Sequence, residues 1–191
     1  KQLSQSGIKR VFVTTHYLGD KIKEHFGNGK DFGVEMSYIV EEQLLGTAGG
    51  VNLIPQQQSP ILIVNGDILT DVDFRAMFAF HIEHHADLTM AVRQYEMQVP
   101  YGVVETDGWR VLNVVEKPTH NVFVNAGIYL IEPDVQKLVP RDQKFDMTDL
   151  IQLLLDRGRN VVSFPVWEYW RDIGQLTDYE QAQTDVKNGK L

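Results

Sequence analysis

Residues 60–67, with the sequence Pro60-Ile61-Leu62-Ile63-Val64-Asn65-Gly66-Asp67, join a continuous apolar run to a short polar end. The four aliphatic residues have the length of a strand, and an unbroken apolar run is typical of a central parallel strand covered on both faces. Asn65, Gly66 and Asp67 would then stand at the carboxyl end of that strand, where open α/β sheets bind their ligands. This stretch therefore predicts an α/β sheet with a site at its strand ends.

The residues around this strand alternate between strand and helix patterns. Leu18, Ile22 and Phe26 form an apolar stripe at helical spacing, and Gly27 follows as a stop signal. The predicted elements of the first half are a strand at 11–13, a helix at 18–26, strands at 34–40 and 60–64, a helix at 73–85 and a strand at 88–92. Strands and helices that alternate with short connections predict a mostly parallel sheet with helices on both faces.

The second half of the chain has a different pattern, with successive strands and little helix between them. Strands are predicted at 101–105, 110–116, 122–131 and 161–165, and helices at 147–157 and 175–187. Thr106-Asp107-Gly108 has the composition of a hairpin turn. We therefore expect one domain over residues 1–191, in which an α/β half (about 1–95) precedes a smaller mixed β half (about 96–191).

The composition of the chain excludes several classes of function. Its 191 residues include 26 acidic and 18 basic side chains, and the net charge of −8 disfavours nucleic-acid binding, which requires a basic surface. There is no cysteine, which excludes thiolate catalysis and Cys-ligated zinc. No run of about 18 apolar residues occurs, so we expect no membrane span. No apolar leader with a cleavage site opens the chain, and we expect a cytoplasmic protein.

Two aspartates are candidates for a metal site. Asp67 follows the apolar strand, and Asp172 lies within residues 170–174, Trp-Arg-Asp-Ile-Gly, just ahead of the predicted C-terminal helix. Carboxylates at such positions suit Mg²⁺, which takes one or two carboxylates and completes its shell with water and substrate oxygens. Each aspartate also fits a structural role, Asp67 as the cap of a helix or turn and Asp172 as the N-terminal cap of a helix. The residues alone leave both interpretations open.

Three further segments place small or polar residues where a ligand could approach. The small residues at 46–50 would bring backbone N–H groups to a base or a phosphate, although an ordinary turn has the same pattern. Glu116-Lys117-Pro118 closes a predicted strand with an adjacent acid and base. Asn125 lies inside an otherwise apolar strand, where a buried amide needs hydrogen-bond partners.

The histidines of the helix predicted at 73–85 favour a structural interpretation. His81 and His85 share one helix face, with His84 beside them, but no third ligand is evident in the sequence. We expect them to lie on an exposed face and to contribute no chemistry.

Taken together and in order, the singled-out segments resemble one known family. They are Glu-Glu-x-x-x-Gly-Thr-Ala-Gly (41–49), Asn-Gly-Asp (65–67), Tyr-Gly-Val (101–103), Glu-Lys-Pro (116–118), Asn-Ala-Gly-Ile-Tyr (125–129) and Trp-x-Asp-x-Gly (170–174). This set resembles the sugar nucleotidyltransferases, the nucleoside-diphosphate-sugar pyrophosphorylases. The sequences of these motifs are most similar to those of bacterial members that carry CBS domains, several of which are assigned to guanylyl transfer.

The resemblance implies a Rossmann-like fold and a defined reaction, in which a sugar 1-phosphate and a nucleoside triphosphate form a nucleotide sugar and pyrophosphate. It implies an enzyme of the guanylyl- or thymidylyltransferase type, whose Mg²⁺ would be held by Asp67 and Asp172. The other site residues that it implies are Glu41, Gly46, Thr47, Asn65 and Gly66 for the nucleotide, and Gly102, Glu116, Lys117, Asn125 and Gly127 for the sugar phosphate. Since the attacking phosphate is already an anion, the chemistry requires positioning and charge neutralisation, to which Lys117 contributes, rather than a general base.

One departure from the family changes the expectation for this chain. Family members open with a strand and a loop of the form Gly-Gly-x-Gly-Thr-Arg-Leu that wraps the triphosphate, and no such segment occurs here. We interpret the chain as a truncated domain that lacks about 40 residues before Lys1. Such a chain is expected to be inactive alone, with an unpaired strand edge that self-association or a shifted strand would cover.

Two alternatives to nucleotidyl transfer remain open at this stage. A GT-A glycosyltransferase shares the nucleotide-sugar sheet and uses an Asp-x-Asp metal motif, a form that Asp71-Val72-Asp73 matches. A non-catalytic regulatory or binding module would keep the pocket without turnover. Use of a nucleotide sugar as a donor would favour the glycosyltransferase. The absence of an upstream phosphate loop would favour the non-catalytic module.

Overall fold

The apolar run at 61–64 forms strand β3 (Ile61–Val64) of a four-stranded sheet. The computed structural model describes residues 1–190, and its sheet order is β3-β8-β5-β9. The other strands are β5 (Leu88–Gln98), β8 (Thr119–Ile131) and β9 (Val161–Pro165). β8 runs antiparallel to β3 and β5, whereas β9 runs parallel to β5. Three of the four strands therefore share one direction. In the described chain β3 lies at an edge of this sheet with only an antiparallel partner, so it is not the central parallel strand that its apolar run predicted.

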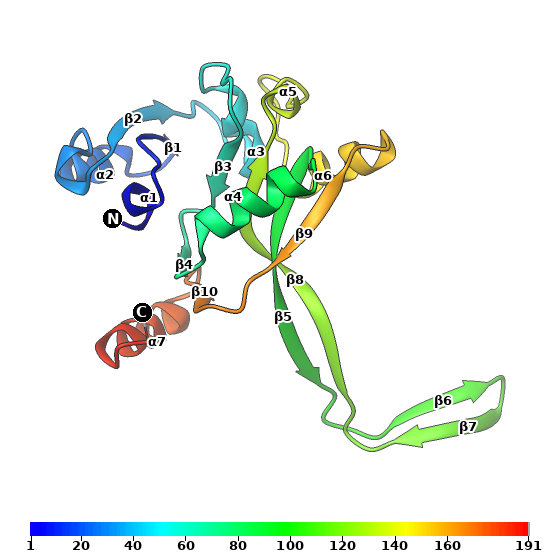
Figure 1. The fold of residues 1–191 in the computed structure, drawn as a ribbon. Helices are drawn as coiled ribbons and strands as arrows, with labels where there is room; N and C mark the ends of the chain where they lie inside the picture. Colours follow the sequence, from blue (N-terminus) through cyan, green and yellow to red (C-terminus); the bar gives the residue numbers. More distant parts are fainter. Residues whose placement is uncertain (191) are drawn as a thin grey trace.

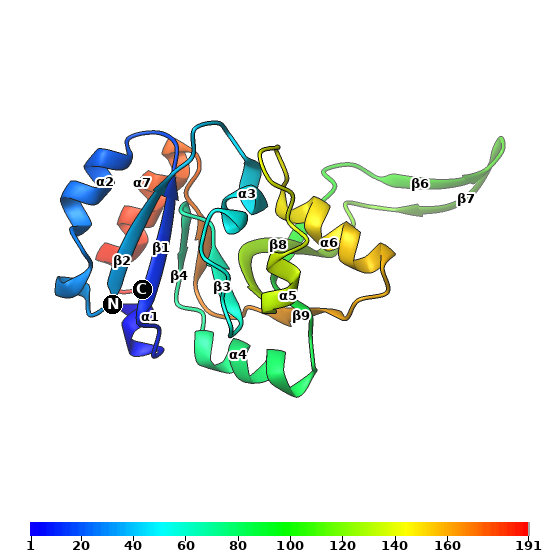
Figure 2. The same cartoon turned by 90° about the horizontal axis from the view of Figure 1, so that it is seen from above.

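A separate two-stranded parallel ladder contains β1 (Arg10–Thr15) and β2 (Glu35–Val40). The helix that connects them is α2 (Gly19–Phe26), which ends at a glycine as predicted, and a 3₁₀ turn, η1 (Lys30–Phe32), precedes β2. Figure 2 shows β1 and β2 beside the larger sheet. In the described chain the two ladders form separate sheets.

Helices cover both faces of the larger sheet, as the strand and helix alternation predicted. The remaining helices are α1 (Gln2–Gln5), α3 (Gly46–Gly49), the 3₁₀ turn η2 (Gly50–Asn52), α4 (Phe74–Glu83), α5 (Pro133–Gln136), α6 (Met147–Asp156) and α7 (Leu176–Lys187). Along β8, Tyr129 and Ile131 face the core that contains α6, whereas Ile128 and Leu130 face the core that contains α4. This two-residue alternation is the geometry of a strand that is buried on both sides.

The histidine at position 81 contradicts the expectation of an exposed face. His81 is fully buried on the same side of α4 as Met77. Its Nδ1 lies 2.7 Å from Oγ1 of Thr89, and its Nε2 lies 3.2 Å from Oε1 of Glu132. The four-residue spacing that suggested a polar face places His81 one turn beyond Met77, toward the sheet.

A long hairpin projects from the body of the molecule (Figure 1). Its strands are β6 (Val103–Asp107) and β7 (Arg110–Val115), and every residue in them is exposed. The sequence predicted the hairpin and its turn. It did not predict the length of β5, which continues to Gln98 and carries the hairpin outward together with β8.

A short antiparallel pair joins two distant parts of the chain. Strand β4 (Ile68–Thr70), which follows β3, pairs with β10 (Trp170–Asp172). The hydroxyl of Thr70 also donates to the carbonyl of Tyr169 at 2.8 Å. Neither strand was predicted, since three residues give too short a pattern to recognise.

The C-terminal helix is fixed by a buried carboxylate. Asp185 on α7 is 2% exposed and lies 3.0 Å from the hydroxyl of Tyr169 and 3.3 Å from Nη2 of Arg171. The Lys190 ammonium, with further hydrogen bonds from Tyr169 and Gln181, holds the pKa of Asp185 at about 2, against the opposing effect of burial. This network attaches α7 to β10. Within residues 1–190, no helix is both long and apolar enough to cross a membrane.

The attachment of α7 is expected to weaken in acid. The folded-state pKa of Asp185 lies below its ordinary 3.8, so its stabilisation is complete above about pH 4 and is lost as the pH falls toward 2. The difference in free energy of unfolding between wild type and Asp185→Asn should therefore shrink between about pH 5 and about pH 2.5. Urea unfolding at several pH values measures this difference. A difference that stays constant would contradict the ionised role of Asp185.

Candidate active site

The two predicted metal aspartates converge, although about a hundred residues separate them. Asp172 ends β10 opposite Ile68, and the N–H of Ile173 donates to the carbonyl of Asp67 at 2.8 Å. A β-carbon on Gly174 would lie 3.0 Å from Oδ1 of Asp172 and 3.7 Å from Oδ2 of Asp67. Both carboxylates therefore border the same small space. The β4–β10 pair produces this approach.

The surroundings of the two carboxylates form a groove of about 700 Å³. Two arginines line it, but both are engaged by the chain. Nη1 of Arg93 donates to the carbonyls of Val166 and Glu168, each at 2.9 Å. Arg171 contacts Asp185, and the hydroxyl of Tyr169 together with the nearby aspartates raises the pKa of this arginine. Both arginine side chains of the groove are therefore already bonded within the chain.

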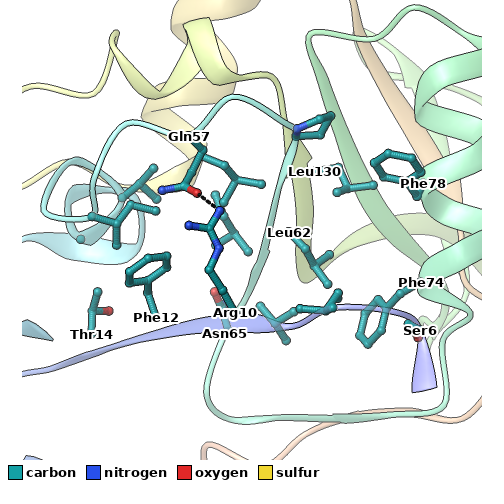
Figure 3. A pocket seen from close by; sticks show the side chains of 18 of the residues that line it. Ser6, Arg10, Phe12, Thr14, Gln57, Leu62, Asn65, Phe74, Phe78 and Leu130 are labelled. Atoms are coloured by element: carbon teal, nitrogen blue, oxygen red, sulfur yellow. Dashed lines mark hydrogen bonds between the residues drawn. The ribbon is translucent and has the colours of Figure 1, made fainter. Parts of the chain in front are cut away.

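A second and larger hollow of about 1020 Å³ lies between β1 and β3 (Figure 3). Five of the predicted site residues line it: Gly46, Thr47, Asn65, Gly66 and Asp67. Asp67 also lines the smaller groove, so the two hollows meet at this residue. The structure therefore brings the predicted nucleotide residues and the predicted metal residues to one place.

The loop at 46–50 is organised by Asp146, a residue that the sequence analysis missed. Oδ1 of Asp146 accepts from the N–H of Thr47 at 3.0 Å, and this hydrogen bond is the main cause that lowers the pKa of Asp146. The N–H groups of Ala48 and Gly49 donate to the carbonyl of Phe145. These three amides are therefore bonded within the chain and do not supply a phosphate cradle as they stand. The sequence signal that could have revealed Asp146 is the helix-start pattern that it forms with Asp149, since the two residues make a capping box.

Substituting alanine for Gly46 is expected to reduce the free energy of unfolding by about 2–4 kcal/mol. Gly46 has φ +79°, and a β-carbon there would lie 2.5 Å from Oδ1 of Asp146 and 2.8 Å from the Phe145 carbonyl oxygen. Gly158→Ala is the matched control, because Gly158 has φ +66° but nothing within 4 Å. The control should lose about 1–2 kcal/mol, the cost of the backbone conformation alone. Equal losses in urea unfolding would show that the close packing at Gly46 has no energetic role.

Glu41 helps to shape the same loop. Its Oε2 accepts from the N–H of Leu45 at 3.4 Å, and its Oε1 would lie 2.9 Å from a β-carbon on Gly50. The carboxylate thus points to its own loop, next to the wall that Gly46 and Thr47 give to the large hollow.

Asn125 and Gly127 stabilise an irregularity in β8. Gly127 has φ +70°, and the pairing of β5 with β8 shifts register close by. Nδ2 of Asn125 donates to the hydroxyl of Tyr129 at 2.7 Å, and its Oδ1 accepts from the N–H of Gly127 at 3.1 Å. Burial raises the pKa of Tyr129. Asn125 is exposed, not buried as the sequence suggested, because it lies just before the part of β8 that enters the core, and its amide nevertheless bonds within the chain. Gly127 lies against the side chain of Asn65.

The remaining predicted residues lie together at the base of the hairpin. A β-carbon on Gly102 would be 3.1 Å from Oε2 of Glu116, and the N–H of Val99 donates to the carbonyl of Pro118 at 3.0 Å. Lys117 between them has a left-handed backbone with φ +45°. In the described chain these residues line neither of the two hollows.

The Asp-x-Asp sequence of the glycosyltransferase alternative has a structural role. The side chain of Asp73 caps α4 and accepts from the N–H groups of Arg75 and Ala76 at 2.9 and 3.1 Å. A carboxylate with these partners is an ordinary helix N-cap. The paired carboxylates of the groove are those of Asp67 and Asp172.

A helix-covered α/β sheet with a small-residue loop and a carboxylate at the carboxyl end of β3 defines the class of α/β proteins that bind ligands at their strand ends. The family follows from the sequence. The chain belongs to the nucleotidyl transferase family, whose profile matches residues 1–189. This finding confirms the resemblance drawn from the ordered motifs.

Two curated relatives illustrate the similarity. One is the UTP–glucose-1-phosphate uridylyltransferase of Synechocystis sp., 31% identical over 99% of this chain and 54% of that protein. The other is the D-glycero-alpha-D-manno-heptose 1-phosphate guanylyltransferase of Aneurinibacillus thermoaerophilus, 31% identical over 97% of this chain and 82% of that protein. The chain thus spans about half the length of the first of these.

A solved structure shares the fold. The crystal structure of HddC from Yersinia pseudotuberculosis superposes with a TM-score of 0.72 and 22% identity, covering 97% of this chain and 82% of that one. The α/β fold class predicted from the sequence is therefore confirmed.

Proposed function

We propose that the protein containing this chain is a sugar-1-phosphate nucleotidyltransferase of the cytoplasm. The observation that carries the proposal is the convergence of Asp67 and Asp172 at the point where the two hollows meet, in a chain that belongs to the nucleotidyl transferase family. The named relatives act on a sugar 1-phosphate, which supports the same substrate class here.

The reaction that fits this site joins two anions. A phosphate oxygen of the sugar 1-phosphate forms a bond to the α-phosphorus of a nucleoside triphosphate. The bond between that phosphorus and the oxygen bridging to the β-phosphorus breaks, and pyrophosphate leaves. Because the nucleophile is already deprotonated, the protein has to align the reactants and offset their charge.

Two carboxylates with space beside them fit a magnesium ion, which takes one or two carboxylates and fills its shell with water and phosphate oxygens. Asp67 and Asp172 would hold it. When bound, Mg²⁺ neutralises phosphate charge. Among residues 1–190, no group of three or more acidic or histidine side chains is placed to hold a metal.

The other residues divide between the two substrates. Gly46, Thr47, Asn65 and Gly66 form the wall on which the nucleotide would lie, and Glu41 keeps the 46–50 loop in shape. The residues proposed to contact the sugar phosphate are Gly102, Glu116, Lys117, Asn125 and Gly127. Lys117 would supply the positive charge on that side.

Further parts of the enzyme are proposed to lie outside this chain. A glycine-rich loop carrying an arginine would wrap the triphosphate, and CBS domains would accompany the catalytic domain. Association of two or more copies is also part of the proposal, since a strand edge is open in this chain.

A substrate panel tests the proposed function. The longest form of the protein that its gene encodes would be incubated with Mg²⁺, each nucleoside triphosphate and a set of sugar 1-phosphates, with pyrophosphate release as the measurement. We expect release that requires both substrates. Use of a nucleotide sugar as a donor, without pyrophosphate release, would support the glycosyltransferase alternative, and no turnover with any pair would support the non-catalytic one.

A further inference from the structure

The short helix α3 and the residue before it take their position from a distant segment of the chain. α3 is a turn of four residues, and a single helical turn is not stable by itself. The N–H of Phe145 donates to the carbonyl of Leu45 at 2.8 Å, and the carbonyl of Phe145 accepts from the N–H of Gly49 at 3.1 Å. The conformation of this turn therefore depends on the residues at the start of α6.

A single carboxylate joins the turn to α6. Oδ1 of Asp146 accepts from the N–H of Thr47 at 3.0 Å, and this hydrogen bond lowers the pKa of Asp146. Asp146 is also the N-cap residue of α6, where it forms a capping box with Asp149. The hydroxyl oxygen of Thr47 accepts in turn from the N–H of Met147 at 2.8 Å. Because the carboxylate is ionised, the hydrogen bond that it accepts is about twice as strong as one between neutral groups.

Helix α6 is a fixed support for this contact, because one side of it is buried. Met147, Leu150 and Leu154 belong to the core on one face of the larger sheet. Figure 2 shows α3 beside α6. The turn held by this helix contributes Gly46 and Thr47 to the lining of the large hollow. The packing of the core thereby fixes the position of one wall of the hollow.

We propose that Asp146 is a positioning residue for the nucleotide, because it holds the turn at 46–49 in the conformation that forms this wall. This inference rests on the proposed function, which assigns the nucleotide to the same wall. Among the described residues Asp146 lines neither hollow, and Nζ of Lys144 lies 3.5 Å from its Oδ2. The carboxylate therefore acts through the backbone of Gly46 and Thr47 rather than by contact with phosphates, which it would repel.

A turn that is no longer held is expected to weaken nucleotide binding selectively. When only a fraction of the molecules has the binding conformation, the apparent dissociation constant rises by the inverse of that fraction. A hydrogen bond to a charged group changes such an equilibrium by about tenfold to a hundredfold. The residues proposed for the sugar 1-phosphate at the base of the hairpin line neither hollow, so binding of that substrate should not depend on Asp146.

Substitutions of Asp146 in the longest gene product test this proposal. Calorimetry in the presence of Mg²⁺ measures the dissociation constant of the tightest-binding nucleotide among ATP, CTP, GTP, UTP and dTTP. In Asp146→Ala this constant, and the KM for the same nucleotide in pyrophosphate release, should rise about 10–100-fold. The KM for the sugar 1-phosphate and kcat should stay within about threefold, as expected when an interaction common to the ground state and the transition state is lost.

Two further substitutions at the same position separate the turn from the helix cap. Asp146→Asn keeps an acceptor oxygen for the N–H of Thr47 and should recover most of the nucleotide affinity. Asp146→Ser keeps a good N-cap residue for α6, but the serine side chain is too short to reach Thr47 as well. This variant should bind the nucleotide as weakly as Asp146→Ala, and it provides the test if the alanine variant does not fold.

Asp149→Ala is the matched control, because it weakens the same end of α6 without releasing the turn. Oδ2 of Asp149 accepts from the N–H of Asp146 at 2.9 Å, so its removal opens the capping box and leaves the hydrogen bond to Thr47. This variant should lower the urea midpoint as Asp146→Ala does, but change the nucleotide dissociation constant less than about twofold. The amide of Thr47 should exchange with deuterium at least about tenfold faster in Asp146→Ala and at the wild-type rate in Asp149→Ala.

The proposal would be overturned by an unchanged nucleotide affinity in Asp146→Ala, by an equal rise in the KM of both substrates, or by a rise of the same size in Asp149→Ala. Absence of nucleotide binding by the wild-type protein would also overturn it. Failure of the proposed function is a different result: the wild-type protein would bind the nucleotide and release no pyrophosphate with any sugar 1-phosphate. A selective loss of nucleotide affinity in Asp146→Ala would then still support the positioning role of this residue.

Discussion

Replacing Asp67 by asparagine is expected to reduce pyrophosphate release by about 10²–10³-fold while leaving the fold intact. Asp67 is exposed, lies where both hollows meet, and shares the space above Gly174 with Asp172. Asparagine keeps the size of the side chain but removes the charge that would hold Mg²⁺. The measurement is the rate of pyrophosphate release by the longest gene product, with circular dichroism to verify folding.

Asp73→Asn is the matched control for this substitution. Asp73 belongs to the Asp-x-Asp sequence of the alternative function, yet its side chain caps α4. Asparagine is as good an N-cap as aspartate, so this variant should keep both its stability and its turnover. Full activity of Asp67→Asn would remove Asp67 from the mechanism, and a severe loss in Asp73→Asn would restore the glycosyltransferase interpretation.

The 191-residue chain by itself is expected to release pyrophosphate at least about 10³-fold more slowly than the longest gene product. A triphosphate would add about four negative charges to a chain of net charge −8. The amides of Thr47, Ala48 and Gly49 are bonded to Asp146 and Phe145, so they are not free to receive it. Losing one preorganised donor costs about 10²–10³ in rate, and such losses are not additive.

This second prediction is tested by comparing the 191-residue chain with the longest gene product. Both proteins would be assayed with the same substrates and Mg²⁺, and binding of the sugar 1-phosphate would be followed by calorimetry. A slow chain that still binds the sugar phosphate would agree with the proposed division of the site. Comparable turnover by the two proteins would show that residues 1–191 already contain everything that the reaction requires.

Local sequence patterns predicted most of the individual elements. The helix predicted at 18–26 is observed at Gly19–Phe26, and the strand predicted at 161–165 is observed at these residues. Periodicity succeeds here because burial of one or both faces sets the order of apolar residues along the chain. The short strands β4 and β10 escaped prediction, because three residues carry no readable period.

The candidate site was predicted only in part, because its residues depend on contacts between distant parts of the chain. The sequence singled out Asp67 and Asp172 as metal candidates, but it did not predict the β4–β10 pair that brings them together. It missed Asp146, which holds the 46–50 loop from almost a hundred residues away. It also placed His81 on the surface, since neighbours in sequence do not reveal which side of a helix the sheet will cover.

The sequence by itself determined the family, the alternation of strands and helices, and the residue types available for chemistry. Only the tertiary structure decided that a large hollow lies between β1 and β3, that Gly102, Glu116 and Lys117 stand at the base of a projecting hairpin, and that Asp67 borders two hollows. The physical reason is the range of the interactions. Apolar periodicity acts over a few residues and is written locally, whereas strand pairing and the position of a carboxylate depend on partners that only the folded chain brings together.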